Sequence, residues 1–88
     1  MYNYLAEFFA TTVFVYVILA TGNPLAIAAA LAIIIILVEP ISGAHLNPAV
    51  TVVMAAIGKL PSTEVVSYAL AQIFGWLVAI ELYKRYKL

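Results

Sequence analysis

The chain has 88 residues, of which 67% are hydrophobic and 9% charged, and its mean hydropathy is +1.15. This balance lies far outside that of soluble domains, so we expect an integral, multi-pass membrane protein whose surroundings are the lipid bilayer. Four Lys and Arg residues balance four Asp and Glu residues, so the chain has no field of one sign with which to bind nucleic acid. Because no cysteine is present, disulfides, thiolate metal sites and cysteine catalysis are excluded.

The first two apolar segments predict a helical hairpin that crosses the membrane twice. Residues 2–20 are long enough to span a hydrocarbon core, which needs about 20 residues. We expect a span here and not a signal peptide, because a basic start and a convincing cleavage site are missing. The Gly-Asn-Pro sequence at 22–24 predicts a helix stop and a restart. The second crossing is expected over residues 24–39, since Pro40 removes a backbone donor.

The rest of the chain contains one full crossing and one helix that is too short to cross. Residues 64–83 predict the third span, which Ser62 or Thr63 is expected to cap. The short helix is expected over residues 48–57, between an Asn-Pro opening and a glycine. At about 1.5 Å per residue it is about 15 Å long, roughly half of a 30 Å hydrocarbon core.

The short helix and the chain before it predict a re-entrant loop over residues 41–57. We call the membrane face at the start of the first span side A and the opposite face side B. Both ends of the segment lie at side A, so residues 41–47 must enter as non-helical chain and the half-helix must return. Residues 1–88 are therefore expected to form one all-α membrane unit with three transmembrane helices and a re-entrant half-helix.

The residues at the start of the half-helix suit contact with a neutral, hydrogen-bonding solute. Asn47 is expected to cap the helix, which would orient its NH₂ group outward as a donor. The positive end of the helix would point at the bilayer centre. Carbonyls of the entering chain cannot pair internally, and Gly43 and Ala44 are small enough to let a solute approach. Such a track favours a neutral molecule and repels a cation or a proton.

The stretch SGAHLNPAVT at 42–51 resembles the first-repeat signature loop of the major intrinsic protein family, the aquaporins and aquaglyceroporins. Ala6-Glu7-Phe8 with Thr11 resembles the first helix of that family, and Ala71-Gln72 with Gly75 resembles its third. The resemblance covers nearly the whole chain but only one of the two repeats of the family.

This resemblance implies a passive channel for water or small neutral solutes such as glycerol. It assigns the central donor to Asn47. It also implies a row of backbone carbonyls, contributed by Gly43, Ala44, His45 and Leu46. A complete pore would need a second repeat in the opposite orientation. An inverted copy of this chain, in a dual-topology homodimer, would supply it. By the same resemblance four such dimers would cluster.

The sequence departs from the family pattern at three positions. Val50 stands where second repeats carry the filter arginine, and Ile27 aligns with an aromatic filter residue. These two residues would make an apolar constriction, so the resemblance does not imply strict selectivity for water. Glu39 stands where a small residue is usual. A carboxylate near a helix C-terminus is unfavourable, so Glu39 is expected to face water or a cation.

The charged residues bear on how the chain inserts. Three basic residues follow the third span at side B: Lys84, Arg85 and Lys87. Side A carries Lys59 and the terminal amine, so the positive-inside rule favours a cytoplasmic side B only weakly, and dual topology stays open. In an antiparallel pair, Lys84 and Arg85 of one copy would share a face with Glu39 and Glu64 of the other. Our hypothesis is that these residues form inter-chain ion pairs.

Three polar residues inside the apolar segments have both a structural and a functional interpretation. Glu7 could carry protons, but we favour a brace that accepts from amides of the re-entrant loop, as the resemblance implies. His45 could be a pH gate or a metal ligand, yet without neighbouring ligand residues we expect a packed, hydrogen-bonded ring and no metal site. Gln72 could line a pore, but we favour a hydrogen bond to another helix.

Two further inferences concern packing and function class. Ala71, Gly75 and Ala79 form a small-residue stripe that allows close helix contact. No nucleophile with a base and no phosphate loop is visible, so an enzyme and a cofactor are not expected. The rival functions are a non-conducting structural or assembly subunit of a membrane, and a half-channel that pairs with a different chain.

Overall fold

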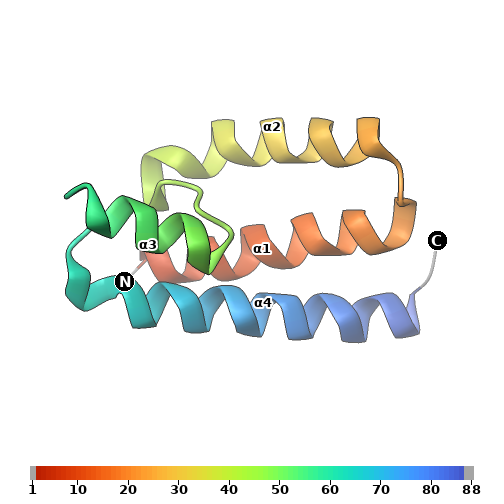
Figure 1. Ribbon diagram of the computed structural model, residues 1–88. Helices are drawn as coiled ribbons and strands as arrows, with labels where there is room; N and C mark the ends of the chain where they lie inside the picture. The colour runs from red at the N-terminus through yellow and green to blue at the C-terminus, as the bar shows by residue number, and fades with distance from the viewer. Residues whose placement is uncertain (1, 87–88) are drawn as a thin grey trace.

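The computed structural model describes residues 2–86, and all regular structure in that range is helical. In chain order the helices are α1 (Tyr2–Thr21), α2 (Pro24–Ser42), α3 (Pro48–Ala56), the 3₁₀ turn η1 (Ser62–Glu64) and α4 (Val65–Arg85). Helix α1 lies between α2 and α4, and α3 covers one half of the bundle (Figure 1). Three helices are long and apolar enough to cross a membrane. The expected all-α membrane fold is thus confirmed.

The turn between α1 and α2 forms where the Gly-Asn-Pro sequence predicted it. Gly22 has a φ of +55°, which favours glycine, and its amide bonds to the carbonyl of Ile18 at 3.0 Å. Asn23 then caps α2, and its Oδ1 accepts from the amides of Leu25 at 2.9 Å and Ala26 at 3.0 Å. Two helices of nearly equal length therefore lie antiparallel.

Helix α2 runs past Pro40 to Ser42, so the expected end at residue 39 was wrong. A proline removes one hydrogen bond from a helix, but neighbouring contacts can hold the next turn. The amide of Gly43 closes that turn on the carbonyl of Glu39 at 3.0 Å. Ser42 is held from the side, because its Oγ donates to Glu7 at 2.6 Å and its carbonyl accepts from the Tyr68 hydroxyl at 2.8 Å. The non-helical entry is correspondingly shorter than expected, from residue 43 to residue 47.

The start of the last helix also differs from the expected cap. Neither Ser62 nor Thr63 makes a capping bond to α4, which follows directly on η1. The turn is instead fixed from the other end of the chain, because Glu64 Oε1 accepts from Asn3 Nδ2 at 3.1 Å and from the Tyr4 hydroxyl at 3.0 Å. A contact between the starts of α1 and α4 thus replaces a local cap.

Close packing of α1 on α4 depends on the small-residue stripe. A Cβ added to Gly75 would lie 2.8 Å from the carbonyl oxygen of Phe8 and 3.1 Å from the Cβ of Thr11. Ala79, one turn further on, is fully buried. Because residue 75 has no Cβ, the backbones of α1 and α4 approach closely enough for polar side chains of the two helices to form hydrogen bonds with each other.

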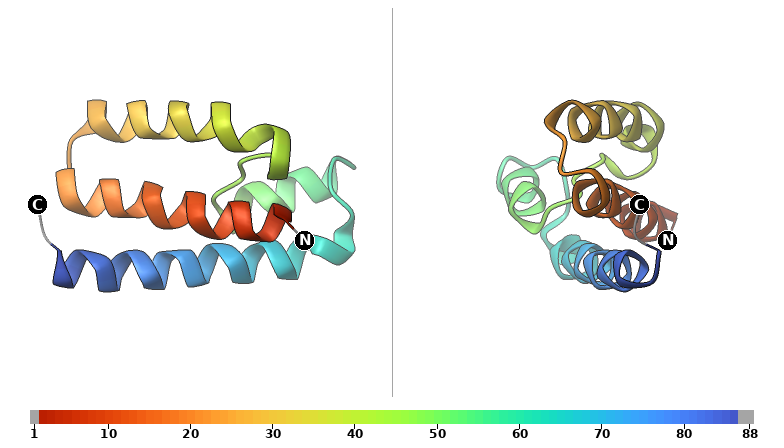
Figure 2. Two further views of the ribbon diagram at one scale, coloured as in Figure 1. Left: turned by 180° about the vertical axis from the view of Figure 1, so that it is seen from behind. Right: turned by 90° about the vertical axis from the view of Figure 1, so that its right-hand side faces the viewer.

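The interior of the molecule is largely polar and its surface is apolar. Within residues 2–86 the buried polar side chains are Glu7, Thr11, Thr12, Ser42, His45, Thr51 and Gln72. The bundle measures 39 × 23 × 20 Å, so its long axis exceeds a hydrocarbon core of about 30 Å. The chain after α2 turns inward, and α3 then runs back toward the end where α2 finished (Figures 1 and 2).

Candidate functional site

The entry to α3 has an unusual backbone. Gly43, Ala44 and Leu46 have φ values of 92°, 51° and 61°, which is the left-handed region. Only Gly43 adopts this conformation without strain, because a residue with a Cβ pays about 1 to 2 kcal/mol for it. Gly43 is required for a second reason, since an added Cβ would lie 2.9 Å from Nε2 of His45. Such a backbone persists only where its surroundings hold it.

Glu7 holds this backbone from α1. Its Oε1 accepts from the amide of Leu46 at 2.8 Å and from Gln72 Nε2 at 2.9 Å. Its Oε2 accepts from the amide of His45 at 3.0 Å and from Ser42 Oγ at 2.6 Å. The side chain is fully buried, so both carboxylate oxygens are satisfied by protein donors. These contacts are the ones that a brace of the loop needs.

Thr51 joins the half-helix to the rest of this network. Its Oγ1 lies 2.9 Å from His45 Nδ1 and 2.9 Å from Gln72 Nε2, and it also reaches the carbonyl of Asn47 at 3.4 Å. The ring of His45 is buried and packs on Tyr68 with ring centroids 4.9 Å apart. His45 is therefore a packed, hydrogen-bonded residue, and Gln72 bonds to two neighbouring helices.

Polar groups of two kinds, backbone carbonyls and a side-chain amide, remain free in the loop. Within residues 2–86 the carbonyls of Gly43, Ala44, His45 and Leu46 accept no hydrogen bond. Asn47 is exposed, and its Oδ1 caps α3 by accepting from the amide of Ala49 at 2.8 Å. Its Nδ2 has no partner in the same range, so it is an oriented donor at the positive end of α3. The loop thus offers four unpaired carbonyl acceptors and one unpaired donor.

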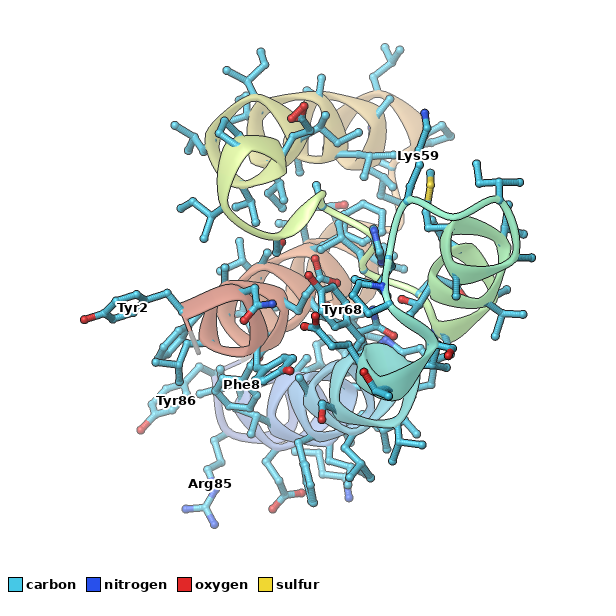
Figure 3. The ribbon with its side chains drawn as sticks, turned by 90° about the vertical axis from the view of Figure 1, so that its left-hand side faces the viewer. Tyr2, Phe8, Lys59, Tyr68, Arg85 and Tyr86 are labelled. Atoms are coloured by element: carbon cyan, nitrogen blue, oxygen red, sulfur yellow. The ribbon has the colours of Figure 1, made fainter. Side chains whose placement is uncertain are left out.

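A hollow opens from this loop toward side A. Its volume is about 470 Å³, and Gly43, His45 and Tyr68 line it together with the charged residues Glu39 and Lys59. Figure 3 shows Tyr68 in the middle of the molecule and Lys59 on the segment between α3 and η1. Glu39 is exposed, as its place near a helix C-terminus led us to expect. The loop is thus next to an open hollow that is lined in part by charged side chains.

The other candidate residues lie away from this loop. Ile27 is half-buried near the start of α2 at side B, whereas Val50 is exposed in the first turn of α3. Lys84 Nζ lies 3.6 Å from Glu81 Oε2 on the same helix. Glu64 is bonded within the chain to α1. A single copy therefore does not bring Ile27 and Val50 together.

Ser42, Thr51 and Tyr68 each bond within the site, although no contact is predicted for them from the sequence. Tyr68 lies one helical turn before Gln72, and this i,i+4 spacing is the signal that could have placed both on one face. Ser42 and Thr51 flank the loop in sequence, but only the fold shows that both reach it from the inside.

The family of the chain follows from a comparison of its whole length with known families. The family model described as major intrinsic protein matches residues 1–87. The chain belongs to the major intrinsic protein family. It is an integral, multi-pass membrane protein, because the family match and the three long apolar helices both indicate one. No solved structure gives a significant match to this chain.

Curated relatives within the major intrinsic protein family carry two kinds of name. The probable glycerol uptake facilitator protein of Thermotoga maritima is 43% identical over 72 residues, which are 81% of this chain and 29% of that protein. The glycerol uptake facilitator protein-like 6 of Lactiplantibacillus plantarum is 38% identical over 88 residues, 90% of this chain and 41% of that protein. Aquaporin Z of Bradyrhizobium diazoefficiens is 55% identical over 42 residues, 48% of this chain and 18% of that protein. The chain thus spans less than half the length of these relatives.

Proposed function

We propose that this protein is a passive channel for water or small neutral solutes such as glycerol. One observation carries the proposal. The carbonyls of residues 43–46 and the Nδ2 of Asn47 make no hydrogen bond within residues 2–86, so together they would form a track of acceptors that ends on a donor. The names of the relatives, as aquaporins and glycerol uptake facilitators, agree with such a track.

A solute would move along this track by exchanging its hydration for the protein groups one at a time. Water and polyols both donate to carbonyls and accept from an amide NH₂, so they suit each end of the row. A cation would gain from the carbonyls but would meet the positive end of α3 beside Asn47. The track therefore favours neutral molecules.

The pore requires a second repeat, for which we propose an inverted copy of the same chain. Asn47 and Val50 are exposed on an open face, so a single copy offers one wall of a passage. In an antiparallel pair Ile27 of one copy would approach Val50 of the other and form an apolar constriction. Lys84 and Arg85 would face Glu39 and Glu64 across the pair, and four pairs would form the complete assembly.

A substitution at Asn47 tests the donor without removing the cap. In Asn47→Asp the retained oxygen still accepts from Ala49, while the NH₂ group is lost. We expect glycerol and water flux into proteoliposomes to fall about tenfold, because one lost hydrogen bond of about 1.4 kcal/mol is a factor of ten. The thermal midpoint in detergent should stay the same.

The matched control is Asn23→Asp, because Asn23 caps α2 before a proline in the same way and lies outside the site. Its flux should equal that of the wild type. If Asn47→Asp conducts normally, the proposed donor role is wrong. A wild-type protein that produces no swelling of vesicles would favour a non-conducting structural subunit, and conduction only after addition of a second chain would favour a half-channel with a different partner.

A further inference from the structure

A groove lies between the ends of α1 and α4 at side B, on the face away from α3. Two adjoining hollows form it, one of about 290 Å³ beside Tyr16 and one of about 390 Å³ along the outer face of α4, and both are lined by Leu82 and Tyr86. Figure 3 shows Tyr86 on the side of the α1 and α4 pair opposite to α3. The groove is therefore separate from the site around Asn47.

The floor of the groove is apolar and its end is closed by a tyrosine. Besides Leu82, the apolar lining comes from Val13 of α1 and from Phe74, Leu77 and Val78 of α4. The Tyr16 hydroxyl donates to the carbonyl of Tyr86, which holds Tyr86 beside the hollow. Because both helices can span the membrane, this surface faces lipid, and tyrosines at its end mark the headgroup level.

The charges at this end of the bundle attract an anion. After the third span the sequence has Lys84, Arg85 and Lys87 against Glu81, a net charge of 3 − 1 = +2. Glu81 pairs with Lys84 at 3.6 Å, and within residues 2–86 Arg85 has no ion pair. Arg85 lines the second hollow, and its side chain points away from the bundle (Figure 3). Side A has Lys59 and the terminal amine against Glu39 and Glu64, so the excess of positive charge lies at side B.

We propose that this groove binds one anionic phospholipid. The guanidinium of Arg85 would bind the phosphate, with Lys84 beside it, and one acyl chain would lie along the two hollows. Arginine suits this role because its planar fork matches the geometry of a phosphate. A free phosphate would use the basic residues alone, whereas a lipid uses the apolar hollows as well. The proposal does not depend on whether the protein conducts, but it is an alternative to the proposed inter-chain ion pairs, because Arg85 cannot bind a phosphate and a carboxylate of an inverted copy at once.

Lipid binding to the delipidated, purified chain in detergent tests the proposal by native mass spectrometry. The probes are dioleoylphosphatidylglycerol, which is anionic, and dioleoylphosphatidylcholine, which is zwitterionic. We expect the wild type to bind the anionic lipid at least about fivefold more tightly, since each basic residue near a headgroup contributes about that factor. Arg85→Gln should lower this preference about fivefold, and a double change with Lys84→Gln should abolish it.

Two controls separate a site from general attraction and from a phosphate pocket. Lys59→Gln, at the opposite end, should leave the preference unchanged, and an equal loss in this variant would overturn the proposal. Leu82→Trp fills both hollows and should weaken the binding of both lipids. The helicity measured by circular dichroism should stay unchanged. Equal affinity of the wild type for the two lipids, or full displacement of the anionic lipid by inorganic phosphate, would also contradict a lipid site.

Discussion

At the scale of single residues, the buried carboxylate of Glu7 determines the conformation of the re-entrant loop. Ala44 and Leu46 adopt left-handed φ values that cost free energy for residues with a side chain. The carboxylate compensates by accepting from the amides of His45 and Leu46. In an extended chain these successive amides would point to opposite sides, so the two could not reach the carboxylate together. The same backbone leaves the carbonyls of the loop free, so one acid accounts for both the strain and the acceptor row.

Glu7→Gln tests this account. The substitution replaces an acceptor oxygen by an NH₂ group that faces donors, so at least one buried donor loses its partner. We expect the free energy of unfolding to fall by about 1 to 3 kcal/mol. Thermal unfolding in detergent, followed by circular dichroism, measures the change. The control is Glu81→Gln, an exposed acid of α4, which should leave the midpoint unchanged. Equal shifts in the two variants would show that Glu7 is not a brace.

At the scale of helices, α3 depends on its neighbours. It has 9 residues, which is too short to be stable alone in water or to cross a membrane. Thr51 attaches it to α4 through Gln72, and Gln72 also bonds to Glu7 on α1. The position of the half-helix therefore follows the distance between α1 and α4, which Gly75 keeps short.

Gly75→Ala is expected to separate α1 from α4. The added Cβ would lie 2.8 Å from the carbonyl oxygen of Phe8, and a backbone atom in a helix cannot move aside alone. Overpacking of this kind costs about 1 to 3 kcal/mol, and the thermal midpoint in detergent should fall accordingly. The separation should also weaken the bond from Gln72 to Glu7, so flux should fall with stability.

The control for Gly75→Ala is Ala29→Val, which adds carbon atoms at an exposed position of α2. Its midpoint should stay close to that of the wild type. A Gly75→Ala protein with the wild-type midpoint would show that the close approach of α1 and α4 is not needed for stability.

At the scale of the whole molecule, one open face and a weak charge bias favour an antiparallel pair. Asn47, which carries the free donor, is exposed together with Val50, so a single copy leaves this face open. Side B carries three basic residues, against Lys59 and the terminal amine at side A. Such a small difference favours a cytoplasmic side B only weakly, so it permits the two orientations that the proposed pair needs.

Cysteine labelling measures the orientation directly, because the sequence has no cysteine of its own. Ser62→Cys places a thiol at side A and Thr21→Cys places one at side B, both at exposed positions. With dual topology, an impermeant maleimide added outside should label about half of the molecules in each variant. Complete labelling of one variant and none of the other would contradict the antiparallel pair and the proposed inter-chain ion pairs.

The number of crossings and the site of the break could be predicted because they depend on chain length and local chemistry. An Asn-Pro opening and a glycine stop leave a helix too short for the bilayer, whatever its surroundings. The end of α2 and the cap of α4 could not be predicted, since Pro40 and Ser62 are local signals that contacts from distant residues overrode. Ser42 is held by Glu7 and Tyr68, and Glu64 is held by Asn3 and Tyr4.

What the sequence determined by itself was therefore an apolar chain with three crossings, a re-entrant half-helix and an asparagine at its inner end. The tertiary structure alone decided which polar groups are satisfied and which stay free. That distinction is set by distance between helices, because a buried donor pairs with whichever acceptor the packing brings within about 3 Å. Close contact of α1 with α4 brings Glu7, Gln72 and Thr51 together. In the same arrangement the carbonyls of residues 43–46 and the side-chain NH₂ group of Asn47 stay unpaired.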